Sequence, residues 1–355
     1  MLLKKLGLQN FRNVSEALFS FHPKFNLFLG KNGQGKTNLL EAIYLLSFGH
    51  SFRVSDFRDL IRWGENRGLI RTWVASDLGE EERHIVLEEE KKKVFKNGKP
   101  VRPDQFSSIP IVLFAPEAIL LWKGSPQGRR EYIDHLIAKC SATYGKHLRL
   151  YRRALLQRNR ILKEELLSIA EKKSQLSIWD SPLIEEGNIL IREKKKWIEH
   201  LNSYLHRHYD QIAGKPSFAL LDYQPNTEEN IFSQRISEAR EEELARRTTL
   251  VGPHRDDFLA LLAQKKLSLF GSQGEMRSFT LAIKLSEISV LEEIFQKPPI
   301  LLLDDVLSEL DSARSGYFFR RVADFPGQVF ATATHFELFP PGILKDYQSW
   351  QIGEE

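Results

Sequence analysis

Two kinds of apolar spacing alternate along the chain and divide it into three parts. Up to about residue 116, short apolar runs of strand length are separated by turn residues, with one helical run at residues 37–49. Residues 117–214 instead carry apolar side chains at helical spacing, with lysine and arginine on the other faces. Strand-length runs return at residues 217–223 and 258–270. This order predicts an α/β fold in which a helical segment interrupts the sheet domain.

The helical segment is expected to form a short arm. Ser181 followed by Pro182 predicts the start of its second helix, because serine is a good N-cap and proline suits the first helical position. The apolar repeat is too brief for a long coiled coil, so two antiparallel helices joined by a polar link are predicted. We therefore expect residues 1–116 and 215–355 to form one head domain, with residues 117–214 as a helical insertion.

The composition limits where the protein works. Of 355 residues, 42% are hydrophobic and 28% are charged, as in a soluble globular protein. No apolar run reaches the roughly eighteen residues that a membrane-spanning helix needs, and the first residues show no signal-peptide pattern. Cys140 is the one cysteine, which excludes an internal disulfide and fits a reducing compartment. We therefore expect a cytoplasmic protein without a membrane partner.

The net charge is only +4, but the basic residues are unevenly distributed. Between Lys123 and Lys163 there are eleven lysine and arginine residues and two acidic residues. Such a local excess is typical of a surface that binds phosphate groups, and it also occurs on helices that only face solvent. Contacts to the phosphates of duplex DNA would give affinity without reading the base sequence. The candidate DNA contacts are Lys146, Arg149, Arg152, Arg153, Arg158 and Arg160.

The segment GKNGQGKT matches the phosphate-binding pattern G-x-x-x-x-G-K-[ST]. It follows a strand-like run and opens the helical run, which is the context that this pattern requires. Backbone N–H groups of the loop and of the helix start suit the β-phosphate. We expect Lys36 to reach the β- and γ-phosphates and the Thr37 hydroxyl to ligate Mg²⁺. The predicted nucleotide contacts are Gly30, Lys31, Asn32, Gly33, Gln34, Gly35, Lys36, Thr37 and Asn38.

A second nucleotide motif follows more than 260 residues later. Residues 300–303 are four consecutive apolar residues, which predict a strand buried on both faces. Asp304, at the end of this strand, is expected to hold Mg²⁺. Asp305 is expected to orient or deprotonate the attacking water.

Three further segments resemble motifs of ATP-binding-cassette (ABC) ATPases. Ser272–Glu275 resembles the signature loop, which contacts the γ-phosphate bound by the other subunit; taken alone, it is an ordinary capped helix start. Residues 308–311 resemble the loop that follows the paired acids in this class. His335, at the end of a strand-like run, matches the switch histidine of the class. Together the motifs favour a nucleotide site that two subunits share.

Longer segments are similar to one family. GKNGQGKTNLLEAIYLLS, GSPQGRR followed by YID, VGPHRDDF and LLLDDVLSELDSAR resemble the RecF family of bacterial recombination-mediator ATPases, and the similarity covers nearly the full length. The resemblance implies an α/β fold, with an ABC-type P-loop ATPase head, a helical arm and no long coiled coil. It also implies an ATP- and Mg²⁺-dependent homodimer that clamps duplex DNA at gaps. Such a clamp would act with RecR and RecO to load RecA, with slow, DNA-stimulated ATP hydrolysis.

The resemblance also assigns roles to individual residues. One departure concerns Glu275, since many members of the family have glutamine at this position, and a carboxylate near a phosphate would repel it. The implied residues are Lys36, Thr37, Asp304 and Asp305 acting on the nucleotide of their own subunit, Ser272 with Gly274 acting on that of the partner, His335 as the switch, and Arg12 with Asn13 near the adenine.

Two other classes of protein remain open from the sequence. The chain could be the ATPase subunit of a membrane transporter, although the helical insertion and its basic residues argue against this. It could also be a nucleotide-gated scaffold with negligible turnover. Replacement of Asp305 by asparagine separates the scaffold from the enzyme, because only an enzyme loses activity.

Overall fold

The chain divides into two units, which are described separately. The structure is a computed structural model that describes residues 1–54, 56–77, 79–89, 91–102, 109–305, 312–336, 339 and 346–353. By their internal contacts, Met1–Ala118 and Glu287–Glu355 form the first unit and Ile119–Ser286 forms the second. Residues 215–286, which the sequence pattern assigned to the head, are thus grouped with the helices. The inserted domain at residues 117–214 stays a prediction.

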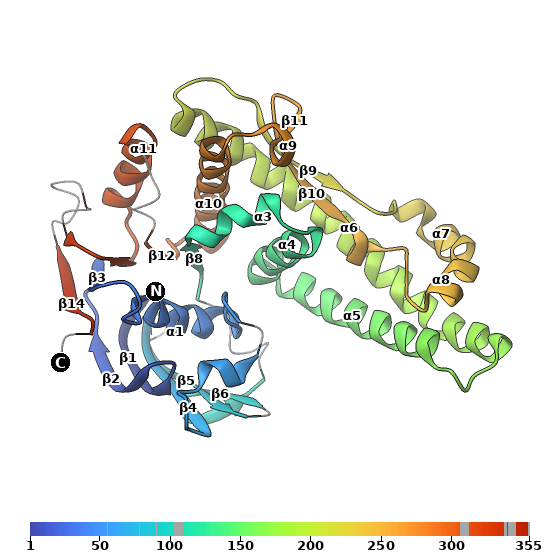
Figure 1. Cartoon of the computed structure of the whole chain (residues 1–355), viewed down its shortest axis with the longest axis horizontal. Helices are drawn as coiled ribbons and strands as arrows, with labels where there is room; N and C mark the ends of the chain where they lie inside the picture. Colours follow the sequence, from blue (N-terminus) through green and yellow to red (C-terminus); the bar gives the residue numbers. More distant parts are fainter. Residues whose placement is uncertain are drawn as a thin grey trace. The chain divides into compact units, whose positions relative to one another are not determined.

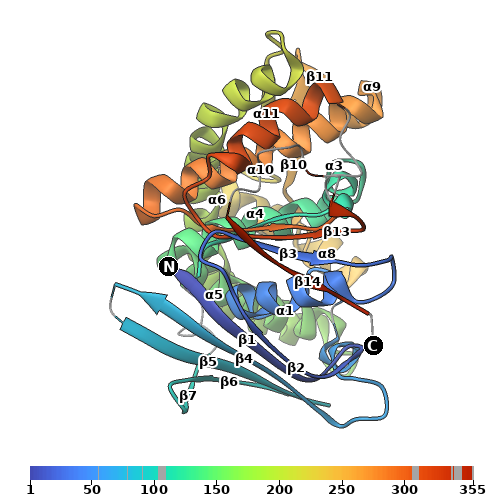
Figure 2. The same ribbon diagram turned by 90° about the vertical axis from the view of Figure 1, so that its left-hand side faces the viewer.

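The first unit contains two sheets with one helix between them (Figure 2). The antiparallel sheet has, in spatial order, β2 (Val14–Ser20), β1 (Leu2–Phe11), β4 (Arg67–Ser76), β5 (Gly79–Glu88), β6 (Lys92–Lys96) and β7 (Lys99–Val101). The parallel sheet has β14 (Tyr347–Gln351), β3 (Phe25–Leu29), β13 (Val329–Ala333), β12 (Ile300–Leu303) and β8 (Ile111–Phe114). Helix α1 (Lys36–Phe48) lies between the sheets, and η1 (Phe57–Leu60), η2 (Pro116–Ile119) and α11 (Ser312–Ala323) complete the unit.

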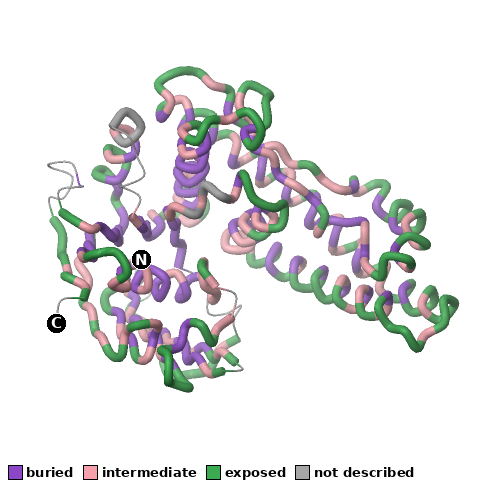
Figure 3. Tube along the Cα trace, in the orientation of Figure 1, coloured by how far each residue is buried: buried purple, intermediate pink, exposed green. Residues whose placement is uncertain are grey.

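Burial explains why four of the parallel strands, β3, β8, β12 and β13, are almost entirely apolar, whereas the edge strand β14 is largely exposed. Every residue of β3, β8, β12 and β13 is buried (Figure 3), as expected for strands covered on both faces. Helix α1 is apolar on several sides, because it contributes to a core shared with both sheets. Burial of each such leucine or isoleucine side chain stabilises the fold by roughly 1.5–3 kcal/mol. The core therefore fixes the ends of β3 and β12, where the nucleotide motifs begin.

The second unit is built on two long antiparallel helices, α5 (Ala142–Lys163) and α6 (Ile169–Ala213), which form the predicted arm (Figure 1). A three-stranded antiparallel sheet, β11-β10-β9, accompanies them. The remaining elements are α3 (Leu120–Lys123), α4 (Pro126–Cys140), β9 (Ala219–Gln224), η3 (Glu229–Ile231), α7 (Phe232–Glu238), α8 (Arg240–Arg246), η4 (Pro253–Arg255), β10 (Asp257–Leu262), β11 (Lys265–Lys266), α9 (Leu267–Phe270) and α10 (Gln273–Phe295), of which α10 continues into the first unit.

Two predictions about these elements are wrong. The second helix of the arm does not begin at Ser181, because α6 is continuous and contains Pro182 in its interior. Interior proline costs about 3 kcal/mol in an isolated helix, but Leu176 and Leu183 are fully buried on either side of it. The helix instead begins after Ser168. Residues 267–270, expected as part of a strand, form the short helix α9. None of the helices in the described ranges is both long and apolar enough to cross a bilayer.

Candidate nucleotide site and nucleic-acid interface

The phosphate loop connects β3 to α1 through backbone conformations that require glycine. Gly30, Gly33 and Gly35 have φ angles of 151°, 85° and 97°, a region that side chains disfavour. A Cβ at Gly35 would also lie 2.5 Å from Asn13 Nδ2, so a side chain there would displace Asn13 from its present position. The predicted order of strand, loop and helix is therefore confirmed. The contacts of this loop with a nucleotide stay a prediction.

Lys36 is held at the centre of the phosphate loop. Its ammonium group donates hydrogen bonds to the backbone oxygens of Gly30 at 2.8 Å and Lys31 at 3.1 Å. The side chain is buried, whereas Lys31 and Asn32 are exposed at the rim of the loop. Among the described residues, the hydrogen-bond partners of this buried ammonium are carbonyl oxygens, and a phosphate oxygen would be a stronger acceptor than these.

The two predicted Mg²⁺ ligands lie next to each other. Thr37 Oγ1 donates to Asp304 Oδ1 at 2.9 Å. Thr332 Oγ1, on the neighbouring strand β13, donates to the same oxygen at 2.8 Å and accepts from the N–H of Asp305 at 2.9 Å. Hydroxyl and carboxylate oxygens are the donors that Mg²⁺ prefers, so the pair fits this ion. Thr332 was not predicted, since only the pairing of β12 with β13 brings it to Asp304.

Asp305 and His335 extend the same edge of the parallel sheet. Asp305 has a φ of 45°, a left-handed conformation that is uncommon for residues other than glycine. Backbone strain of this kind is concentrated at functional sites. His335 is exposed two residues after the end of β13. The loop at residues 308–311 lies outside the described residues.

Arg12 and Asn13 join the phosphate loop to the β1–β2 turn. Asn13 Nδ2 donates to the backbone oxygen of Gln34 at 3.2 Å, and Asn13 Oδ1 accepts from Asn38 Nδ2 at 2.7 Å. Arg12 donates from Nε and Nη2 to both carboxylate oxygens of Glu41 at 2.8 and 2.7 Å. Glu41 is fully buried on α1, so this bidentate pair fixes the turn against the helix.

The sequence analysis missed two residues of this network, Glu41 and Arg53. In each case the sequence contains a feature that could have indicated the residue's role. Glu41 is an acidic residue within the apolar run of α1, where an unpaired charge would be costly. Arg53 follows α1 and donates to Asn38 Oδ1 at 2.9 Å, which places a cation beside the first turn of the helix. Its signal is its position in the segment SFRVSD directly after the phosphate-loop helix.

A hollow of about 500 Å³ lies beside Arg12. Trp63 stands at its margin with 99% of its surface exposed. The turn that carries Trp63 is fixed to β1, since the N–H of Arg62 donates to the Asn10 oxygen at 2.9 Å. The hollow is lined by Arg12, Val54, Arg58, Asp59, Ile61, Arg62, Trp63, Gly64, Glu65 and Glu89.

The signature-like loop belongs to the second unit and begins α10. Ser272 and Glu275 form a reciprocal capping box: the N–H of Ser272 donates to Glu275 Oε2 at 2.8 Å, and the N–H of Glu275 donates to Ser272 Oγ at 3.2 Å. Ser272 is exposed and Gly274 is half-buried. The capping box gives Glu275 a structural role that the sequence analysis did not identify.

Five of the six candidate DNA contacts are exposed on α5. Arg149, Arg153 and Arg160 follow one another at intervals of four and seven residues on one face, and Lys163 extends this face. From Arg149 to Lys163 the basic strip is about 21 Å long, given the rise of an α-helix. Arg152 also donates to Asp134 at 3.2 Å. The exposed candidates are Lys146, Arg149, Arg152, Arg153 and Arg160.

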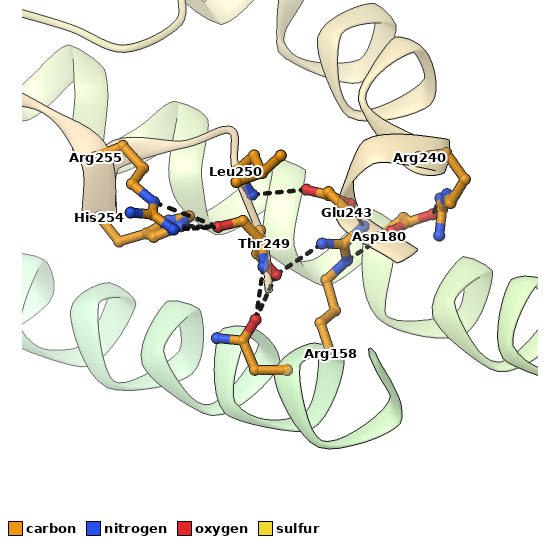
Figure 4. Close-up of polar contacts among 9 residues, drawn as sticks. Arg158, Asp180, Arg240, Glu243, Thr249, Leu250, His254 and Arg255 are labelled. Atoms are coloured by element: carbon orange, nitrogen blue, oxygen red, sulfur yellow. Dashed lines mark hydrogen bonds and ion pairs between the residues drawn. The ribbon is translucent and has the colours of Figure 1, made fainter. Parts of the chain in front are cut away.

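The prediction for the sixth candidate, Arg158, is corrected, because its side chain is fully buried. It donates to Asp180 at 2.9 Å, to Glu243 at 2.9 Å and to Thr249 Oγ1 at 2.9 Å (Figure 4). These partners come from α6, α8 and the segment that leads to η4, so Arg158 joins three parts of the arm. The side chain of Arg158 is thus unavailable to DNA. Its spacing from Ala154 and Leu162, both buried, was the missed signal.

Comparison with known proteins agrees with these features. Residues 2–106 match the family described as RecF/RecN/SMC N terminal domain. The DNA replication and repair protein RecF of Geotalea daltonii is 34% identical, and the alignment covers 100% of this chain and 99% of that protein. The protein of the same name from Geobacter metallireducens is 36% identical, with 94% of this chain and 93% of that protein covered.

Solved structures also include a RecF protein that is similar to this chain over most of its length. A structure of the recombination mediator protein RecF with ATP has a TM-score of 0.86 and 32% identity, covering 94% of this chain and 92% of that one. The Smc head domain of Pyrococcus furiosus, bound to the C-terminal domain of ScpA, has a TM-score of 0.54 and 17% identity, covering 95% and 90%; it supports the fold alone.

Fold and site together define an ABC-type ATPase head of the kind found in SMC proteins, and the predicted fold class is confirmed. The chain belongs to the RecF family of DNA replication and repair proteins. It is an ATP-binding recombination-repair ATPase of this family.

Proposed function

We propose that the chain is an ATP-gated dimeric clamp on duplex DNA. The observation that carries the proposal is the hydrogen bond between Thr37 and Asp304, since it joins the phosphate loop to the paired acids in a site fit for a nucleotide and Mg²⁺. The exposed Ser272 at the start of α10 supports a contact with the γ-phosphate held by a second copy. Closure of two copies would thus depend on the nucleotide.

Within one copy, each side chain has a part in hydrolysis. Lys36 neutralises charge on the β- and γ-phosphates. Thr37 and Asp304 hold Mg²⁺, which, when bound, stabilises negative charge on the phosphate oxygens. Asp305 orients the attacking water and accepts its proton, and His335 senses the γ-phosphate from the neighbouring strand. The remaining predicted residues of the phosphate loop and of the signature loop bind ATP and position it.

The nucleobase is proposed to occupy the hollow beside Arg12. This assignment is supported by two hydrogen bonds of Asn13, which donates to the Gln34 oxygen and accepts from Asn38 Nδ2, so the β1–β2 turn lies close to the phosphate loop. The turn that carries Trp63 offers an aromatic face at the margin of the hollow. The base would therefore bind between the turn that holds Arg12 and the turn that holds Trp63.

Duplex DNA is proposed to bind along the basic strip of α5. Cations in a row along one face suit the regular phosphate backbone and read no base sequence. The name of a related structure places that protein in the RecFOR pathway, which supports work with RecO and RecR. Action at DNA gaps and help in loading RecA are further parts of this proposal. We expect slow ATP hydrolysis that DNA stimulates, and action in the cytoplasm.

Sedimentation of the full chain tests the proposal. The wild type is expected to dimerise when ATP, Mg²⁺ and duplex DNA are present, and Ser272→Arg is expected to stay monomeric. A wild type that remains monomeric under all conditions contradicts the clamp. Asp305→Asn tests the enzyme against a nucleotide-gated scaffold: unchanged hydrolysis at saturating DNA would favour the scaffold.

A further inference from the structure

The edge strand β14 accompanies β3 as far as the phosphate loop (Figure 2). The last pair of the two strands is Gln351 opposite Leu29. Beyond this pair, the N–H of Ile352 donates to the Leu29 oxygen at 2.7 Å. Because the phosphate loop begins at the next residue, Gly30, the segment of residues 352–353 lies directly beside the start of the loop.

Aromatic packing holds β14 and this segment in place. The ring centroid of Trp350 lies 5.3 Å from that of Phe28, on β3, and 5.6 Å from that of Phe21. Ile352 is half-buried and packs against the same core. Packed aromatic rings restrict one another to a defined geometry. Residues 352–353 therefore have a fixed place beside the loop.

The 352–353 segment contacts the phosphate loop at two points. The first is Gly30, where a Cβ would lie 2.5 Å from the Ile352 oxygen and 2.6 Å from Gln34 Oε1. The second is Gln34, whose Nε2 donates to the Gly353 oxygen at 3.4 Å. A Cβ at Gly353 would lie 2.6 Å from Cδ of Gln34 and 2.7 Å from its Nε2. The side chain of Gln34 thus lies between two glycines, and a side chain at either of them would displace it.

Gly30 connects this contact to the lysine of the loop. The Gly30 oxygen accepts a hydrogen bond from the Lys36 ammonium at 2.8 Å. A displaced Gln34 side chain would press on Gly30 and would move this acceptor. A phosphate site stabilises charge well only when its donors are already held in the right positions. The contact between Gln34 and Gly353 can therefore control the affinity of the loop for ATP.

We propose that Gly353 and the side chain of Gln34 position the phosphate loop for ATP. This inference rests on the proposed nucleotide site and adds a residue to it that lies 319 positions along the chain from Gln34. Both are positioning residues, since they act through the backbone at Gly30. The backbone N–H of Gln34 remains one of the predicted nucleotide contacts.

Gly98 provides a matched control for a substitution at Gly353. Its φ angle is 73°, and that of Gly353 is 88°, so both lie in the left-handed region. A Cβ at Gly98, in the turn between β6 and β7, would meet no atom within 4 Å. Alanine introduces similar backbone strain at the two positions, but only at Gly353 does it displace Gln34. The difference between the two variants therefore reports the contact with the loop.

The experiment measures binding of a fluorescent ATP analogue, with Mg²⁺, to the full-length wild type and its variants. Gly353→Ala is expected to weaken binding about tenfold, because small displacements within a site are costly. Gly98→Ala is expected to match the wild type. In a Gln34→Ala background, Gly353→Ala is expected to change binding by less than about twofold, since the side chain that it displaces is absent. Urea unfolding without nucleotide is expected to give similar stabilities for Gly353→Ala and Gly98→Ala.

The outcomes separate this inference from the proposed function. If the wild type binds the analogue and Gly353→Ala binds it as tightly, the inference is overturned and the nucleotide site stands. An equal effect of Gly353→Ala with and without the Gln34 side chain also overturns it, because Gly353 would then not act through Gln34. So does a larger loss of stability in Gly353→Ala than in Gly98→Ala, which would assign the contact to the fold. If the wild type does not bind the analogue, both proposals are overturned.

Discussion

Thr37 Oγ1 and Asp304 Oδ1, from residues 267 positions apart, are joined by a hydrogen bond of 2.9 Å. Thr37 lies in the first turn of α1 and Asp304 directly follows β12, so the bond depends on the order of strands in the parallel sheet. Asp304 also accepts from Thr332 at 2.8 Å, and it is nearly inaccessible to solvent. A carboxylate held in this way keeps one orientation, which suits the role of metal ligand that we propose for Asp304.

The first prediction concerns Thr332, which orients the proposed Mg²⁺ ligand Asp304. Thr332→Val keeps the shape of the side chain and removes the hydroxyl. ATP turnover, or the affinity for Mg²⁺, is expected to fall by about 10–100-fold, as for other outer partners of metal ligands. Titration of the ATPase rate with Mg²⁺ measures the change. Thr334→Val, on the following turn, is the control, and equal effects of the two substitutions would contradict the role of Thr332.

The second prediction concerns the basic strip of α5. Arg153→Ala with Arg160→Ala removes two proposed phosphate contacts, so the slope of log affinity against log salt is expected to become shallower by about 2. Fluorescence anisotropy with labelled duplex DNA at several salt concentrations gives this slope.

Arg192→Ala with Lys195→Ala is the control for this pair, because it removes the same charge from α6. Arg192 pairs with Glu229 at 2.8 Å, and Lys195 pairs with Glu228. The slope for the control is expected to stay near that of the wild type. Equal losses in the two double variants would show that only the overall charge matters, and the strip would not be a binding surface.

The third prediction separates Arg158 from its exposed neighbours. Arg158→Met leaves the carboxylates of Asp180 and Glu243 without their shared partner in the interior. The free energy of unfolding is expected to fall by about 3–5 kcal/mol, as when one member of a buried ion pair is removed. Urea unfolding measures this loss. Arg160→Met, on the exposed face, is expected to change stability by less than about 0.5 kcal/mol.

The fourth prediction concerns His254, which is held in the neutral form. The backbone oxygen of Thr249 can only accept, so His254 Nε2 carries the proton at 3.1 Å, and Nδ1 accepts from the Tyr151 hydroxyl at 2.6 Å. Burial lowers the pKa of His254 from 6.5 to about 4, and the nearby Arg255 adds to this effect. The unfolded chain therefore binds a proton at a higher pH than the folded chain does.

It follows that this histidine contributes stability above pH 6.5, and that the contribution is lost as the pH falls towards 4. Between pH 7.5 and pH 5 the loss is about 2 kcal/mol. Urea unfolding at these two pH values is expected to show a smaller difference for His254→Gln than for the wild type. His206→Gln, at a half-exposed position, is the control. An unchanged pH dependence in His254→Gln would contradict the neutral state.

Several features could be predicted because they depend on nearby residues. The phosphate loop is one, since its glycines and lysine act within eight positions of the chain. The buried strand before Asp304 is another, because a continuous apolar run is suited only to a strand covered on both faces. The antiparallel arm also followed from helical spacing, although the helix start was placed at Ser181 and the capping box at Ser168 was missed.

The sequence by itself was enough to predict the nucleotide-binding motifs, the class of ATPase and the basic character of α5. Each of these depends on local spacing or on residue type. Tertiary structure alone decided which charges are available. Arg158 is buried by carboxylates from α6 and α8, and Thr332 meets Asp304 only through strand pairing. The segments that pack together determine which partner each charged side chain meets. Because a buried charge is costly unless it is paired, a buried side chain such as Arg158 stabilises the fold, whereas an exposed one can contact a ligand.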